Sequence, residues 1–141
     1  MPFTPQNAGG LIPQKPPFVL VDELIYADEK TSCGRFTIPE NNMFVKDGVF
    51  STAGMVESMA QTAAAGTGYL YSVQNKGVPV GYIGAVQKLE VIDWPPAGKP
   101  ITMEINLLTN ILQVSLVSGT VKSDGKIMAT CEMKIFINPS S

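Results

Sequence analysis

The chain has 141 residues, of which 45% are hydrophobic, and its formal net charge is −2 at pH 7. A chain of this length fits one compact domain with a hydrophobic core. The low, nearly balanced charge excludes a typical nucleic-acid binder, which carries a clustered basic excess, and the hydrophobic content excludes an intrinsically disordered chain.

The N-terminal third is predicted to form an arm followed by two strands. Residues 1–12 are expected to be an extended arm. A proline-rich turn precedes the apolar run that begins at Phe18, so residues 18–26 are predicted to form a strand, and residues 31–38 a second one. Residues 39–48, "PENNMFVKDG", show no regular pattern and are expected to be irregular.

One long helix is predicted at residues 51–74. Ser51 or Thr52 is a suitable N-cap, because a hydroxyl oxygen can accept a hydrogen bond from a free amide of the first turn. Asn75 and Gly77 are suitable stop signals, since both residue types tolerate the left-handed conformation that ends many helices. The predicted helix is almost without charge.

Four strands are predicted after the helix, at residues 79–93, 100–109, 111–122 and 126–137. Apolar and polar residues alternate in "ITMEINL" and "KIMATCEMKIFI", as is typical of half-buried antiparallel strands. Asp124-Gly125 predicts a hairpin between the last two. The predicted order is two strands, one long helix and four strands. This order indicates an α+β domain in which one helix packs on a curved antiparallel sheet. Residues 1–141 are expected to form a single domain.

The most apolar stretch, residues 50–73, does not have the composition of a membrane span. A span needs about 20 predominantly apolar residues, whereas this stretch contains Glu57, Gln61 and several glycines. A central charge would be costly in a bilayer. The N-terminus also lacks a basic segment followed by an apolar run. We therefore expect a soluble, cytoplasmic protein.

The two cysteines, Cys33 and Cys131, each lie within a predicted strand. They are expected to be small buried thiols and not a disulfide framework. The chain contains no histidine, which excludes a Cys–His nucleophile and a histidine-based metal site. Because there is also no C-x-x-C pair, we expect neither a metal nor a cofactor.

Glu57 is the only charged residue between residues 50 and 70. Small or apolar residues surround it on both sides of the helix, so the helix is expected to be buried nearly all round. A buried carboxylate must be hydrogen-bonded, paired or neutralised, which makes it a candidate acid or base. Gln61, one turn later, could orient Glu57 or contact a ligand. Alternatively, Glu57 lies at a helix edge, solvated or ion-paired, and does no chemistry.

The start of the helix offers a second chemical element. The free amides of Thr52, Ala53 and Gly54 carry partial positive charge and could stabilise a carbonyl oxygen as negative charge develops on it. Glu57 lies about 6–8 Å farther along the axis, so a thioester carbonyl bound at these amides would place its neighbouring carbons near the carboxylate. Alternatively, Ser51 simply caps the helix.

Three stretches of the chain resemble the β-hydroxyacyl-acyl-carrier-protein dehydratases, a hotdog-fold family. Residues 11–24, "LIPQKPPFVLVDEL", are similar to the family's L-x-P-H-R-x-P-F-L-L-V-D-R stretch. Residues 55–66, "MVESMAQTAAAG", are similar to its central-helix segment E-A-M-A-Q. Residues 82–105 resemble, more weakly, the strand and P-G-D turn that follow the helix. The resemblance spans residues 11–137.

The resemblance implies a hotdog fold, in which a curved antiparallel sheet wraps a long helix. It also implies a dimer whose sheets join and whose acyl tunnels lie at the dimer interface. The implied ligand is an acyl thioester of acyl carrier protein or coenzyme A, as in fatty acid biosynthesis. Glu57 matches the family's catalytic carboxylate, Gln61 its helix glutamine, and the amides of residues 52–54 its site for the thioester carbonyl.

The sequence departs from the family at both of its histidines. The catalytic histidine precedes a phenylalanine in a G-H-F-P-G-x-P segment, and counting back from Glu57 places that position at Met43, followed by Phe44. These two residues are therefore expected at the substrate site. Gln14 stands where the N-terminal P-H-R histidine would be. The segment 42–54 is more similar to a divergent dehydratase-like branch found in aryl-polyene pigment clusters.

Loss of a positioned acid or base typically lowers a rate by about 10²–10⁴, so a homodimer is expected to be a poor dehydratase. Three functions stay open: a heterodimer in which a histidine-bearing hotdog homologue completes a site with Glu57, a homodimeric thioesterase that uses Glu57 alone, and a non-catalytic subunit that binds acyl thioesters or stabilises a partner.

Three lysines are candidates for contacting the carrier or coenzyme: Lys15, Lys46 and Lys88. The alternative is that they are scattered, solvated lysines without this role.

Overall fold

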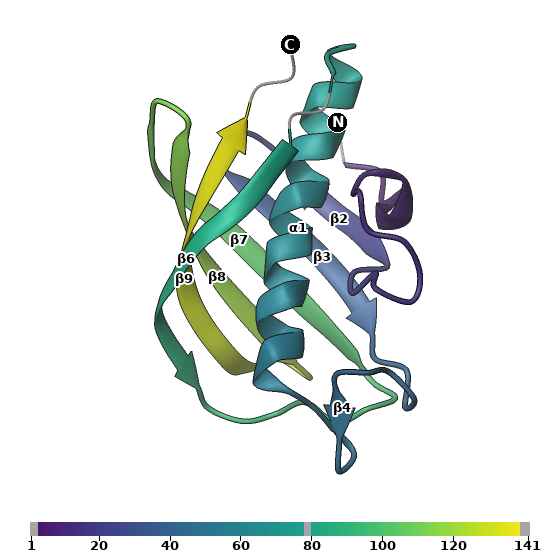
Figure 1. Cartoon of the computed structure of the whole chain (residues 1–141). Helices are drawn as coiled ribbons and strands as arrows, with labels where there is room; N and C mark the ends of the chain where they lie inside the picture. The colour runs from purple at the N-terminus through teal and green to yellow at the C-terminus, as the bar shows by residue number, and fades with distance from the viewer. Residues whose placement is uncertain (1–2, 78–79, 139–141) are drawn as a thin grey trace.

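In the computed structural model, which describes residues 3–77 and 80–138, one long helix lies across the concave face of a curved antiparallel sheet (Figure 1). The described residues form a sheet with the strand order β1-β2-β3-β7-β8-β9-β6. The elements are β1 (Gln6–Asn7), β2 (Glu23–Ala27), β3 (Thr31–Thr37), α1 (Thr52–Val73), β6 (Val80–Val91), β7 (Pro100–Ile111), β8 (Val114–Ser123) and β9 (Lys126–Asn138). The predicted α+β class is confirmed.

The strands after the helix follow the sequence pattern closely. β7, β8 and β9 pair as consecutive antiparallel hairpins. The turn at Asp124-Gly125 has positive φ at both residues, 53° and 77°, as a two-residue hairpin turn of this type requires. β6 pairs with β9 and, among the described strands, with no other, so its second edge is open. None of the helices in the described part of the chain is long and apolar enough to cross a membrane.

The predicted strand at residues 18–26 is shorter than expected and begins at Glu23. Leu20 and Val21 are fully buried, as their apolar character suggested. Residues 18–20, however, bond to the side chain of Gln61 on α1 and not to a neighbouring strand. This segment, which we call the strap, therefore crosses the helix before the chain enters the sheet.

The N-terminal arm contains more structure than the sequence indicated. Gln6–Asn7 form β1, which pairs with β2, and a 3₁₀ turn, η1 (Ala8–Gly10), follows. The amide of Ala8 donates to the carbonyl of Asp22 at 3.0 Å, and Ala8 is fully buried. The arm thus covers one side of the helix–sheet core.

The prediction that residues 39–48 are irregular is wrong at its C-terminal end. β4 (Val45–Lys46) and β5 (Val49–Phe50) form a small hairpin. Its turn residues Asp47 and Gly48 have positive φ angles of 54° and 79°. They form the same Asp-Gly signal as the later hairpin, but strands of two residues are too short to show alternation.

The predicted N-cap of α1 is confirmed, and the helix ends close to Asn75, one of the two predicted stop signals. Ser51 is the N-cap, and its Oγ accepts a hydrogen bond from the amide of Gly54 at 3.1 Å. The helix ends at Val73, and Asn75 has a left-handed φ of 55°. These signals are local in sequence, which explains why they could be read without knowledge of the fold.

The expectation that α1 is buried nearly all round is wrong for the single chain. Met55 and Met59 are fully buried against the sheet, but Val56, Ala60 and Ala64 are only partly buried. These three residues and Glu57 form an apolar stripe with one acid, which we call the outer stripe. The sheet covers the opposite side of the helix (Figure 1).

Glycines bring the helix and β3 very close together. A Cβ added to Gly34 in β3 would lie 2.7 Å from Oγ1 of Thr62 on α1, and one added to Gly66 on α1 would overlap Oγ of Ser32 in β3. A real Cβ does not approach another atom that closely. The small residues of the helix therefore serve packing against the sheet.

Candidate functional site

Glu57 and Gln61 meet on α1 as expected from their spacing of one turn. Nε2 of Gln61 donates a hydrogen bond to Oε2 of Glu57 at 3.0 Å. Glu57 is partly buried and lies on the outer stripe. In the part of the chain that the structure describes, Oε1 of Glu57 has no hydrogen-bond partner, so this oxygen is available to a ligand.

Gln61 is locked in place by the strap. Its side chain is only 1% exposed. Its Oε1 accepts from the amide of Leu20 at 2.6 Å, and its Nε2 also donates to the carbonyl of Phe18 at 2.9 Å. Because the backbone amide of Leu20 can only donate, it fixes the orientation of the side-chain amide and directs the NH₂ group toward Glu57. The sequence did not reveal this role for residues 18–20, because the bond spans 41 positions.

The amides at the start of α1 are only partly available. The amide of Gly54 donates to Oγ of Ser51 at 3.1 Å, and its role at a thioester carbonyl stays a prediction. No acceptor for the amides of Thr52 and Ala53 is found among the described residues. A cavity of about 510 Å³ adjoins both residues, and Trp94 lies beside it, donating through Nε1 to Oγ1 of Thr52 at 3.0 Å.

Gly54 has a packing role. A Cβ at this position would lie 2.6 Å from the ring of Phe50 and 2.9 Å from Cβ of Phe44. Phe44 is partly buried and packs edge-to-face on Phe50, with ring centroids 6.5 Å apart. Its carbonyl also accepts from the amide of Ser51 at 2.8 Å. Phe44 therefore fixes the loop to the helix start.

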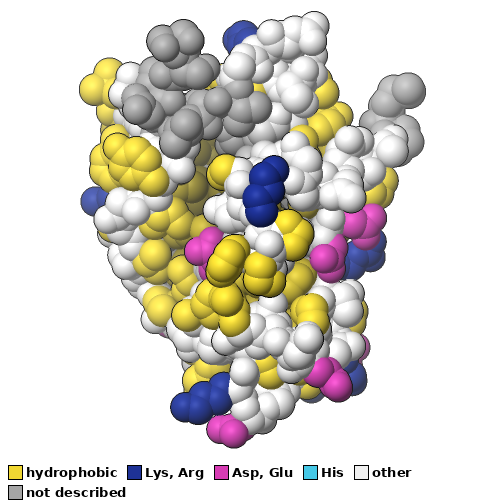
Figure 2. Space-filling view, turned by 45° about the vertical axis from the view of Figure 1, so that its right-hand side comes forward, with side chains coloured by type: hydrophobic (Ala, Val, Ile, Leu, Met, Phe, Trp, Pro, Cys, Tyr) yellow, Lys and Arg dark blue, Asp and Glu magenta, His cyan; other side chains and the backbone are white. Residues whose placement is uncertain are grey.

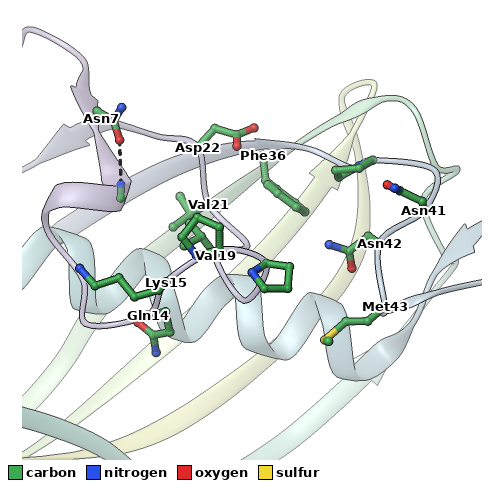
Figure 3. Close-up of a pocket in the computed structure, with 14 residues that line it drawn as sticks. Asn7, Gln14, Lys15, Val19, Val21, Asp22, Phe36, Asn41, Asn42 and Met43 are labelled. Carbon is green, nitrogen blue, oxygen red and sulfur yellow. Dashed lines mark hydrogen bonds between the residues drawn. The ribbon is translucent and has the colours of Figure 1, made fainter.

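Met43, which was predicted to stand at the position of the dehydratases' catalytic histidine, is 58% exposed. It lines a cavity of about 680 Å³ between the strap region and the loop at residues 39–43 (Figure 3). Glu57 lines neither this cavity nor the one beside Thr52. Within one chain, therefore, the carboxylate and Met43 do not share a pocket, and the carboxylate faces the outer stripe.

The three candidate lysines lie in different places. Lys15 lines the larger cavity and Lys46 the smaller one. Lys88 lies on β6 and its Nζ is 3.5 Å from Oε2 of Glu132, in a largely exposed ion pair. The structure thus associates two of the three with a cavity.

The cysteines have the character of inert thiols. Cys131 is buried, and burial raises the pKa of its thiol to about 11. Burial also raises the pKa of Cys33, which is half-buried, and the charges of Glu104 and Asp28 add to that effect. Neutral thiols are poor nucleophiles and metal ligands. Over residues 3–77 and 80–138, no three His, Cys, Asp or Glu side chains gather into a group that could hold a metal.

A protein-family model described as ApeP-like, ApeP dehydratase, matches residues 6–141, nearly the whole chain. The chain belongs to the ApeP-like dehydratase family. The resemblance to hotdog-fold dehydratases that the strap and helix motifs indicated is therefore confirmed. A comparison of the ApeP-like chain with curated proteins found no match.

Solved structures similar to the ApeP-like chain show the same fold. The dehydratase heterocomplex ApeI:P from Xenorhabdus doucetiae has a TM-score of 0.86 at 16% identity, covering 96% of this chain and 93% of that chain. The PaaI protein of the E. coli phenylacetic acid degradation operon has a TM-score of 0.65 at 13% identity, with 80% of each chain covered. A hypothetical thioesterase from Streptococcus pneumoniae has a TM-score of 0.65 at 8% identity, covering 83% and 90%. The ApeP-like chain has the hotdog fold.

Proposed function

We propose that this ApeP-like chain is one subunit of a hotdog heterodimer that removes water from a 3-hydroxyacyl thioester. Glu57 is one of the two proton-transferring groups, and a histidine of the partner subunit is the other. The observation that carries the proposal is a carboxylate held by a buried amide in a chain without any histidine. In support, the similar ApeI:P structure is described as a dehydratase heterocomplex.

The reaction needs a base and an acid. The base removes the proton from the carbon next to the thioester carbonyl, the released electron pair forms the carbon–carbon double bond, and the hydroxyl on the following carbon leaves as water with a proton from the acid. Met43 can do neither. Glu57 has one oxygen bonded to Gln61 and the other free to exchange a proton with a substrate. We assign it the acid role, and the partner's histidine the base role, as the resemblance to the dehydratases implies. The amides of Thr52 and Ala53 are the proposed donors to the carbonyl oxygen.

The surface around Glu57 is suited to a partner subunit. The exposed hydrophobic residues Ile83, Val86 and Leu89 lie on β6 at the open edge of the sheet. Figure 2 shows hydrophobic side chains gathered along the left of the molecule, on the side of α1 and β6. A partner strand that pairs with β6 would extend the sheet, and the partner would then cover the outer stripe. Glu57 would become shielded from water at the interface, where an acyl tunnel would run.

The decisive experiment mixes this chain with a histidine-bearing hotdog homologue whose own helix carboxylate has been removed. Only Glu57 can then complete a site. We expect dehydration of a 3-hydroxyacyl thioester by the mixture and by neither protein alone. Glu57→Gln should lower the rate by about 10²–10⁴ while the complex still forms, whereas Glu29→Gln, in an exposed turn, should leave it unchanged. Undiminished activity with Glu57→Gln would show that another group transfers the proton.

A second candidate function is hydrolysis of the thioester, with Glu57 as the base that activates water. It is favoured by the similarity to a structure described as a hypothetical thioesterase. In that case the chain alone should hydrolyse acyl thioesters, and Glu57→Gln should abolish the activity. If the chain binds acyl thioesters but turns them over neither alone nor with a partner, it is a binding or stabilising subunit. Its carrier, acyl carrier protein or coenzyme A, and its location in the cytoplasm stay predictions.

A further inference from the structure

The β7–β8 hairpin projects beyond the rest of the sheet, at the upper left of Figure 1. β3 pairs with β7 only as far as Asn106, whereas β7 and β8 stay paired out to Ile111 and Val114. The charged turn at residues 28–30 lies at the base of the projection, where the amide of Leu107 donates to the carbonyl of Lys30 at 2.7 Å. The sequence contains no charged residue from position 105 to position 121. The projecting part of the hairpin is therefore uncharged.

A leucine occupies the turn of this hairpin at an unfavourable backbone conformation. Leu112 has a φ of 56°, and it is 95% exposed. A left-handed φ is costly for a residue with a Cβ, and hairpin turns of this kind favour Gly, Asn or Asp. Leu108 and Ile111, on the same hairpin, are also exposed. Among the described residues none of the three packs on the hydrophobic core, so the fold does not explain why these residues, which we call the apolar tip, are large and aliphatic.

A row of apolar side chains continues the apolar tip across the sheet. Ile111 pairs with Val114, Val114 with Phe136, and Phe136 with Tyr82. Directly paired residues lie on the same face of a sheet, and the rings of Phe136 and Tyr82 stack with their centroids 6.0 Å apart. Ser115, next to Val114 in β8, is buried. Because neighbouring residues of a strand point to opposite faces, the row lies on the face of the sheet that points away from α1.

The charges beside this row are suited to an anionic surface. Lys134 lies two residues before Phe136 on the same face, is exposed, and forms no ion pair with any described residue. Its paired residue on β8 is Leu116. Glu132, the next residue of β9 on this face, is bonded to the side chains of residues 87 and 88. Aliphatic side chains, a tyrosine and a lysine whose stem lies on apolar surface are typical of proteins that bind at a membrane–water interface.

The size of the surface argues for lipid over a protein partner. A stable protein–protein interface buries about 800 Å² per partner and takes about 20–30 residues from each side. The apolar tip and the row together have six side chains, on a narrow projection. We propose that the apolar tip inserts into the surface of a phospholipid bilayer, with the ammonium of Lys134 at the headgroup phosphates. The protein lies on the bilayer without crossing it, and the contact does not involve Glu57.

The first test is sedimentation of the full chain with vesicles of phosphatidylcholine alone and of an equimolar mixture with phosphatidylglycerol. The wild type should sediment with both. Lys134→Ala should weaken binding to the mixed vesicles about fivefold, the contribution of one lysine near an anionic surface, and should change binding to phosphatidylcholine little. A wild-type chain that stays in the supernatant with both kinds of vesicle would overturn the proposal.

The second test separates lipid binding from folding with Leu112→Asn. Asparagine tolerates a left-handed φ, so this variant should be at least as stable to heat as the wild type. It should bind the vesicles at least about tenfold more weakly, because a leucine side chain no longer enters the bilayer. Ile92→Asn is the matched control. Ile92 is also exposed, but it lies at the opposite end of the sheet, where its amide donates to the carbonyl of Met128 at 2.8 Å, so the control should bind like the wild type.

A third variant, Val86→Asn, tests whether the open edge of β6 binds the vesicles instead. It should bind like the wild type, and an equal loss in Val86→Asn and Leu112→Asn would overturn the proposal. If the wild type does not sediment and Leu112→Asn weakens assembly with the histidine-bearing homologue, the apolar tip is a protein contact. None of these measurements involves catalysis, and Glu57→Gln should bind vesicles normally. Failure of the lipid proposal is therefore distinguishable from failure of the proposed function.

Discussion

Gln61 is the residue that joins the strap, the helix and the candidate carboxylate. Its buried side-chain amide bonds to Leu20, Phe18 and Glu57 at once. A glutamine buried in an apolar core is unfavourable unless its polar atoms are bonded, and here both its oxygen and its nitrogen are. The same bonds that stabilise the strap therefore hold one oxygen of Glu57 in a defined position.

Gln61→Leu should lower the free energy of unfolding by about 2–4 kcal/mol, because it leaves the buried amide of Leu20 and the partly buried carbonyl of Phe18 without their partner. Chemical denaturation measures this change. Gln113→Leu, at an exposed position, is the matched control and should change stability by about 0.5 kcal/mol or less. Equal stability of the two variants would mean that the strap is not held by Gln61.

The two cysteines show how burial, helped by nearby carboxylates, raises the pKa of a thiol. Both lie in strands of the sheet, and for both the pKa of the thiol is raised chiefly by burial. Neither is adjacent to a histidine, since the chain has none. Under the proposed function, the proton-transferring group of this chain is Glu57, the carboxylate that lies on α1.

At the scale of elements, the contact between α1 and β3 depends on glycines on both sides. Gly34 receives the side chain of Thr62, and Gly66 receives that of Ser32. Such close packing orients the helix on the sheet, and with it the outer stripe that carries Glu57. Each glycine is needed because a side chain of the other element, that of Thr62 or Ser32, occupies the space that its own Cβ would fill.

Gly66→Ala should destabilise the protein by about 1–3 kcal/mol, as overpacking of a tight contact does, although alanine is the better helix former. Adding Ser32→Ala removes the nearest atom, Oγ, and should restore part of the loss. Thermal denaturation of the single and double variants measures both effects. Gly10→Ala, where an added Cβ meets nothing within 4 Å, is the control. A Gly66→Ala protein as stable as the wild type would show that the helix can shift away from β3.

At the scale of the whole molecule, the two faces of α1 differ in how well the single chain covers them. Its sheet covers one face of α1, while in the described residues the outer stripe is only partly covered and the second edge of β6 is unpaired. Exposed strand edges with apolar side chains are sites for pairing with another chain. The half-buried Glu57 lies within this uncovered surface, so assembly and chemistry are expected to depend on each other.

Val86→Lys on β6 should weaken assembly with the histidine-bearing partner at least about tenfold, because it places a charge at the centre of an apolar interface. Val86 is 39% exposed in the single chain, so folding should tolerate the change. Light scattering after size-exclusion chromatography measures the assembly. Ile127→Lys, at a residue 41% exposed on β9, is the control. Loss of assembly in both variants, or in neither, would place the interface elsewhere.

Some features of this protein followed from residues that are close in sequence. The helix bounds were readable because Ser51 and Asn75 act within one turn of the helix ends. The strands after the helix were readable because alternation is a local pattern, and the pairing of Glu57 with Gln61 follows from helical spacing alone. The missing histidine was visible by inspection, and it determined that the family's usual pair of groups is incomplete in this chain.

Other features required the tertiary structure, because they depend on residues that are far apart in the chain. The bond from Leu20 to Gln61, the burial of the arm and the match between Gly66 and Ser32 are set only when the sheet has formed around the helix. The exposure of the outer stripe depends on how far the sheet extends. The separation of Met43 from Glu57 has the same origin, since no local pattern encodes which residues line a common cavity.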